Sequence, residues 1–139
     1  MSNNQTFREH DFSQQLLPET TFENCHFYHC DFSRADLRDA TFINCKFIEA
    51  GDSIGCQFKY ADLRDASFKH CKLGMANFQG ANGFGVEFRE CDLQGASFLK
   101  TSFVNQISHK SYFCLVYITG CNLSYTDFEK QCIEKCDLF

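Results

Sequence analysis

Large apolar residues recur at every fifth position along most of the chain. The series runs from Phe12 to Phe47, from Phe58 to Phe103 with a gap at Gly83, and from Ile118 to Leu138. A small residue stands two positions before most of these centres, and a polar residue usually stands directly before each one. A period of five matches neither the 3.6 of a helix nor the 2.0 of a strand. In an extended segment the small and the large residue point to the same side, so we expect a solenoid whose axis they fill.

The number of centres in each coil follows from sorting them. Taking every fourth centre gives a first column that is phenylalanine throughout: Phe12, Phe32, Phe58, Phe78, Phe98 and Phe128. The other columns begin at Leu17, Phe22 and Phe27, and sorting by threes mixes Phe with Leu from the start. Four faces and twenty residues per coil are therefore predicted. The twenty-three centres make an all-β, quadrilateral β-helix of just under six coils.

One stretch must leave this register and a second is best interpreted as leaving it, and we expect both to project as loops. Phe47 and Phe58 are eleven residues apart, so an excursion at about 48–55 is forced. Between Phe103 and Ile118, Ser108 could instead be the centre of a degenerate repeat. That alternative puts a polar residue at a buried centre and breaks the phenylalanine column, which favours an excursion at about 104–115. The two loops should leave from opposite corners, some two and a half coils apart, within a single domain spanning residues 1–139. The first ten residues are expected to fold over the open end of the rod.

The string ADLRDA occurs at 35–40 and again at 61–66, which is one coil plus the six extra residues of the first excursion. Asp36 should therefore stack on Asp62, and Asp39 on Asp65, with an arginine between the acids of each copy. The simplest interpretation is a solvated ladder whose charges compensate one another.

Composition narrows the function. The formal net charge is −5 and the basic residues form no run, which argues against a nucleic acid or an anionic membrane as partner. No apolar stretch approaches the ~18 residues of a membrane span, and the start lacks a secretion signal, so we expect a cytoplasmic protein. Sequence motifs for catalysis are absent, which predicts a protein that is not an enzyme and needs no cofactor.

The ten cysteines raise the alternative of a metal-binding domain, but none forms a C-x-x-C pair. Eight of them lie two residues before a large apolar centre, a place that alanine takes elsewhere. A position that accepts both residues requires a small apolar body, so we expect free, structural thiols and no metal site. Cys114 lies in the second excursion and is the one thiol worth testing for reactivity.

Several strings resemble the Qnr quinolone-resistance proteins within the pentapeptide-repeat family. They are CDFSRADLRDATF, YADLRDASFKHC, FRECDLQGASF, SYFCLVYITGCNLSY and EKCDLF, and the resemblance extends along essentially the whole chain. It implies a right-handed β-helix with two projecting loops, and binding to the type II topoisomerases DNA gyrase and topoisomerase IV, which are thereby protected from fluoroquinolones. Qnr proteins continue beyond the point matching EKCDLF to a C-terminal helix that forms their homodimer. No part of this chain corresponds to it, so only an N-terminal portion of the family pattern is expected here, without that dimer contact.

Two groups of residues are candidates for partner binding. The first lies in the loops, where recognition residues tend to gather: Glu49, Asp52, Gln106, His109, Lys110, Tyr112 and Phe113. The second is the acidic face with Asp36, Asp39, Asp62 and Asp65, whose carboxylates could stand in for DNA phosphates. Acids exceed bases only slightly on that face, so the loops carry more weight. Phe113 could alternatively pin its loop to the rod, and the alternative for the whole chain is a structural module without topoisomerase activity.

Overall fold

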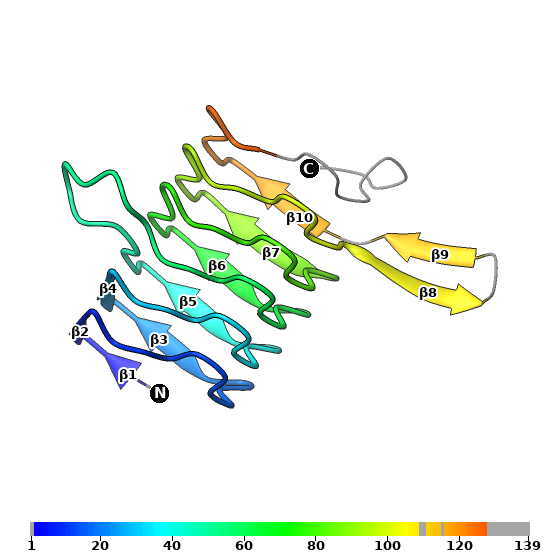
Figure 1. The fold of residues 1–139 in the computed structure, drawn as a ribbon, viewed down its shortest axis with the longest axis horizontal. Coiled ribbons are helices and arrows are strands. Elements are labelled where there is room, and N and C mark those ends of the chain that lie inside the picture. The colour runs from blue at the N-terminus through cyan, green and yellow to red at the C-terminus, as the bar shows by residue number, and fades with distance from the viewer. Residues whose placement is uncertain (1, 109–110, 115, 128–139) are drawn as a thin grey trace.

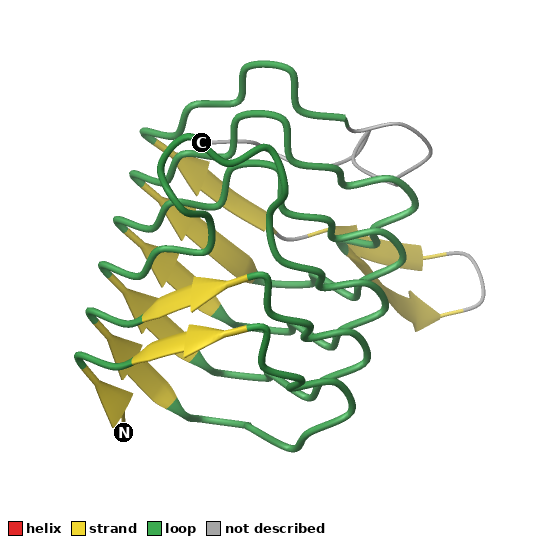
Figure 2. Cartoon of the chain, turned by 60° about the vertical axis from the view of Figure 1, so that its left-hand side comes forward, coloured by secondary structure: helices red, strands yellow, loops and turns green. Residues whose placement is uncertain are grey.

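The chain winds into a four-sided β-helix, seen in a computed structural model that describes residues 2–108, 111–114 and 116–127 (Figure 1). Six strands form one parallel sheet along the rod: β1 (Ser2–Asn3), β3 (Thr21–Glu23), β5 (Thr41–Ile43), β6 (Ser67–Lys69), β7 (Val86–Arg89) and β10 (Val116–Thr119). On the next face, β2 (Thr6–Arg8) pairs with β4 (His26–Tyr28). Figure 2 shows these two faces meeting at a corner. No helix in the described part of the chain is long and apolar enough to cross a membrane.

The pairing register confirms the twenty-residue coil. Phe22 pairs with Phe42, Phe42 with Phe68, Phe68 with Phe88, and Phe88 with Ile118. Each longer step in this series contains one of the two excursions, so both are excised from the register as predicted. Isolated parallel bridges carry the same register on the other faces, for example between Asp36 and Asp62 and between Lys46 and Lys72.

Stacked aromatic rings fill the axis. In the first column, successive ring centroids lie 4.7 Å apart between Phe12 and Phe32 and 4.8 to 5.0 Å apart onward to Phe98, with nearly parallel planes. The rings of the neighbouring columns meet them edge to face, as Phe32 and Phe42 do at 86°. Such pairs add roughly 0.5–1.5 kcal/mol each beyond the apolar area they bury. The gap at Gly83 belongs to this packing, because a Cβ there would lie 2.9 Å from the ring of Phe103 in the next coil.

Most corners are made by a residue in the left-handed region two positions after a centre, except where the excursions begin after Phe47 and Phe103. Arg34 and Asp39 have φ values of 59° and 58°, and this conformation recurs along the described rod. At many corners the N–H of the following small residue closes a β-turn onto the carbonyl of the centre, as Ala35 does onto Phe32 at 3.0 Å. An Asp or Asn before the centre accepts the next free N–H, as Asp31 does from Ser33 at 2.8 Å. We call these closed turns.

A second kind of corner explains the cysteines. After Phe42, Phe68 and Phe88 the described residues hold no such closing hydrogen bond, and the residue that follows each corner is Cys45, Cys71 or Cys91. We call these open turns. The carbonyl of the centre lies in the parallel ladder and also accepts the thiol of the next coil, from Cys71 to Phe42 at 3.3 Å and from Cys91 to Phe68 at 3.2 Å. Cysteine and alanine both fill a small buried place, as predicted, but at different kinds of corner.

The N-terminal residues do not fold over the end of the rod, as was expected. Instead β1 and β2 continue the winding, with Ser2 paired to Phe22 and Phe7 paired to Phe27. Thr6 and Phe7 supply the polar and apolar positions of another repeat, which is why the segment joins the ladder. Phe7 stacks on Phe27 with centroids 5.2 Å apart and extends the fourth column toward the N-terminus.

Candidate functional site

The first excursion is a short loop whose acidic side chains are bound to the rod. Glu49 pairs with Arg8 at 2.8 Å, and Asp52 pairs with His29 at 2.7 Å. The other Asp52 oxygen accepts the N–H of Ser53 at 2.8 Å, and the Asp52 N–H donates to the Glu49 carbonyl, so the tip is a turn built around Gly51 at φ 83°. Both predicted loop acids therefore hold the loop in place through basic groups of earlier coils.

Sequence reasoning missed the partners of these acids and one exposed residue. Arg8 and His29 read as ordinary outward positions of their repeats, since nothing in the pattern says which coil a loop will lie across. Ile54 is 57% exposed on the same loop and offers an apolar contact that the sequence analysis did not select. His26, on the same face as His29, contacts the Tyr28 hydroxyl at 3.1 Å.

The second excursion is an antiparallel hairpin of β8 (Val104–Ser108) and β9 (Ser111–Cys114). It leaves the rod after Phe103 and returns at Val116, and it projects from the side of the rod away from the first loop (Figure 1). In its ladder Gln106 pairs with Tyr112 and Asn105 with Phe113. The structure thus brings three of the predicted residues into one ribbon, while His109 and Lys110 lie outside the described residues.

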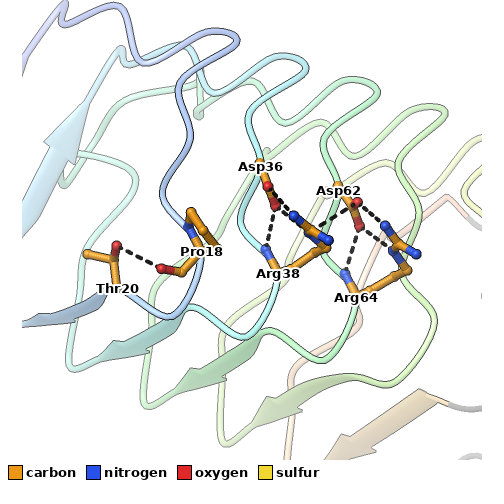
Figure 3. Close-up of polar contacts among 6 residues, drawn as sticks. All are labelled: Pro18, Thr20, Asp36, Arg38, Asp62 and Arg64. Atoms are coloured by element: carbon orange, nitrogen blue, oxygen red, sulfur yellow. Dashed lines mark hydrogen bonds and ion pairs between the residues drawn. The ribbon is translucent and has the colours of Figure 1, made fainter.

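Two of the four predicted acids of the acidic face are paired with its own arginines (Figure 3). Arg38 donates two hydrogen bonds to Asp36 at 2.8 and 2.7 Å, and Arg64 does the same to Asp62 at 2.9 and 2.6 Å. Arg38 also reaches Asp62 of the next coil at 3.8 Å. These hydrogen bonds hold the pKa of the Asp36 carboxyl below its usual value and raise the pKa of both guanidinium groups.

The other two acids of this face occupy the left-handed corner positions. Asp39 and Asp65 are exposed, with φ values of 58° and 59°. The Asp65 carboxylate lies directly over Gly85, at a place where a Cβ would collide with it. The predicted stacking of the two ADLRDA copies is confirmed by the Asp36–Asp62 bridge, and charge compensation within each copy is the arrangement observed.

Seven cysteines have described side chains, and these make structural contacts. Cys25, Cys30, Cys45, Cys56, Cys71, Cys91 and Cys121 form no disulfide. Burial raises the pKa of Cys71, and the neighbouring Cys30 thiol together with burial raises that of Cys56. Within the described ranges, no cluster of histidine, cysteine and carboxylate side chains has the geometry to hold a metal ion.

Comparison with known proteins connects these features to a family. Residues 19–98 match the family described as pentapeptide repeat region. The chain is 50% identical over 136 residues to the quinolone resistance pentapeptide repeat protein QnrB96 of Scandinavium goeteborgense, which covers 98% of this chain and 54% of that protein. It is 47% identical over 67 residues to the pentapeptide repeat protein QnrB4 of Escherichia coli, covering 48% of this chain and 31% of that protein.

The structural match has the same extent. Full-length QnrB1, a plasmid-mediated fluoroquinolone resistance protein, superposes with a TM-score of 0.86 at 40% sequence identity, covering 91% of this chain and 59% of that one. The chain thus spans about half the length of QnrB96 and less than two thirds of QnrB1. The five-residue period, the four-sided coil and these matches show that the chain belongs to the pentapeptide-repeat family, as a relative of the Qnr quinolone-resistance proteins.

Proposed function

We propose that this chain binds bacterial type II topoisomerases, DNA gyrase and topoisomerase IV, and protects them from fluoroquinolones. The observation that carries the proposal is the 50% identity to a quinolone resistance protein across 98% of the chain. Its partners are proteins, so it acts by contact, in the cytoplasm and without chemistry of its own. Activity, partners and location belong to the proposal, because the relatives are longer than this chain.

The loops are the proposed contact elements. They interrupt an otherwise regular rod at two opposite corners, and a rigid scaffold with projecting segments is a common arrangement for recognition. Ile54 and the β8–β9 hairpin can contact a partner without an unpaired charged side chain. Imitation of DNA by the acidic face carries less weight, because Asp36 and Asp62 already bind Arg38 and Arg64.

The test is gyrase supercoiling in the presence of a fluoroquinolone, with this chain titrated in. We expect the intact chain to restore supercoiling. A variant in which a short Gly-Ser connection replaces residues 104–115 should not restore it. Because β7 and β10 pair directly, with Phe88 opposite Ile118, this variant should still fold. Circular dichroism and thermal unfolding will check that it does.

A second variant separates the loops from the acidic face. Asp36→Asn combined with Asp62→Asn removes two carboxylate charges and leaves both excursions in place. We expect this variant to protect gyrase as well as the parent does. If protection survived loss of the hairpin but disappeared in the double Asn variant, the loops would be rejected as the contact elements and charge mimicry would be favoured. No protection by the folded parent chain would reject the proposed function and favour a structural module.

A further inference from the structure

The loop at 48–55 borders an open groove on the fourth face of the rod, which is the face that carries β2 and β4. The groove has a volume of about 690 Å³, within the range of small binding sites. Lys46, Lys72 and Asp92 succeed one another along its floor in three consecutive coils, joined by parallel bridges. The loop residues from Glu49 to Ser53 form one wall.

Two lysines of the floor have no ionic partner among the described residues. Lys46 and Lys72 are exposed neighbours in adjacent coils, and neither forms an ion pair with any residue that the structure describes. Like charges directly opposite each other on a sheet repel, so a carboxylate placed between them would stabilise both. Asp92 lies beside Lys72 in the next coil and keeps its negative charge but forms no ion pair with that lysine; it accepts from the Gln94 N–H at 3.0 Å and from the Asn122 side chain at 3.3 Å.

The acids of the loop do not compensate these lysines either. Glu49 and Asp52 reach toward earlier coils, to Arg8 and His29. The loop is therefore itself an acidic peptide segment bound on a basic face. It occupies the N-terminal part of that face and leaves the equivalent charges of Lys46 and Lys72 open.

Apolar groups lie beside the lysines. Ile48 and Met75 line the same groove, and Met75 is 45% exposed although its sulfur lies over Gly95. An extended peptide places alternate side chains on opposite sides, so it can direct acidic groups to the lysines and apolar groups to Ile48 and Met75. A free inorganic anion would leave the apolar part of the groove uncovered.

We propose that this groove binds an extended acidic segment of a partner protein, with carboxylates on Lys46 and Lys72 and an apolar side chain against Ile48 and Met75. The inference rests on the proposed function in taking its partner to be a protein, and it deepens that function by assigning a chemistry to the contact beside the first loop. Nucleic acid is the competing anionic partner, and the experiment distinguishes the two.

The probe is a fluorescein-labelled short peptide of alternating Glu and Leu, whose binding is followed by fluorescence anisotropy. We expect saturable binding that weakens with added salt. Lys46→Glu and Lys72→Glu should each weaken it about tenfold, because each substitution places a like charge against the bound carboxylates. Lys100→Glu is the matched control, since it makes the same charge change at an exposed corner that does not line the groove.

Three results would overturn the inference: no binding of the acidic peptide, equal binding of a Lys-Leu peptide, or equal losses in all three variants. Preferential, Lys46-dependent binding of a labelled single-stranded oligonucleotide would overturn it in favour of phosphate recognition. Unchanged thermal unfolding of the variants will show that they are folded. The same variants in the supercoiling assay keep the two proposals apart. Gyrase protection without peptide binding rejects only the groove, and peptide binding without protection rejects only the proposed function.

Discussion

At the scale of single residues, the left-handed corners explain where glycine is needed. Side chains at these corners lean over the corresponding corner of the next coil. Tyr60 lies on Gly80 and Glu90 on Gly120, and a Cβ on Gly80 would lie 2.4 Å from the Tyr60 ring. Arg34 in turn lies over the Tyr60 ring at 5.0 Å. At these two corners glycine leaves room for the side chain of the preceding coil, and polar residues fill most of the other corners at a cost in strain.

The Asp36–Arg38 pair predicts a pH-dependent contribution to stability. Because Arg38 lowers the pKa of Asp36 in the folded state, the contribution is present above the usual pKa of aspartate and is lost as pH falls through the folded value. Asp36→Asn should lower the free energy of unfolding at pH 7 by less than about 1 kcal/mol, since the pair is partly exposed. Urea unfolding at a series of pH values should show the difference shrinking below about pH 4.

Asparagine is the right substitution because it keeps the turn. Asn82 occupies the same position two coils further on and accepts the N–H of Phe84 at 3.3 Å, as Asp36 accepts that of Arg38 at 3.2 Å. A constant difference across the whole pH range would show that the loss comes from the turn and not from the ion pair.

At the scale of the structural element, closed and open turns divide the repeats into two classes. Closed turns have Asp, Asn or Ser before many centres and are usually followed by alanine, as in ADLRDA at 35–40. Open turns have Thr41, Ser67 or Glu87 in that place and are followed by cysteine. The signal was present in the sequence, but its meaning depends on which carbonyl each thiol reaches in another coil.

Cys71→Ala tests this division. The variant loses the hydrogen bond to the Phe42 carbonyl and leaves a small void, so we expect a loss of about 1–2 kcal/mol in the free energy of unfolding. Cys71→Ser should lose less, because a hydroxyl in this place can reach a carbonyl of the preceding coil, as that of Thr101 reaches the Phe78 carbonyl at 2.7 Å. Urea unfolding under reducing conditions measures both.

The matched control adds a thiol at a closed turn. Ala66 closes its turn onto the Leu63 carbonyl at 3.0 Å, so Ala66→Cys should bring no stabilisation and will crowd a buried site. If Cys71→Ala were neutral, cysteine and alanine would be interchangeable after all.

At the scale of the whole molecule, the columns of centres transmit packing from coil to coil. Gly83→Leu alone would restore the leucine column but would collide with the Phe103 ring, so a loss of about 1–3 kcal/mol is expected. Phe103→Leu alone should leave a cavity. The double variant should be more stable than the sum of the single losses predicts, because leucine then stacks on leucine as Leu37 does on Leu63. A double-mutant cycle of unfolding free energies measures the coupling, and strict additivity would contradict it.

The architecture was predictable because the repeat has a fixed length along the sequence. Five residues per side and four sides per coil fix which residues stack, so the columns, both excursions and the ADLRDA pairing could be predicted from spacing. Spacing contains no information about segments outside the register. The ion pairs from Arg8 and His29 to the first loop, and the groove above Lys46 and Lys72, depend on how that loop lies across other coils.

Both excursions begin and end at corners where the ladder resumes in register, and this has a consequence for how such proteins can diversify. A change of length within a side shifts every later side chain around the rod, whereas a change of length at these two corners leaves the later coils where they were. Selection can therefore lengthen, shorten or exchange the segments there while the scaffold keeps its stability. The rod acts as a fixed frame with two independent positions for new binding specificity.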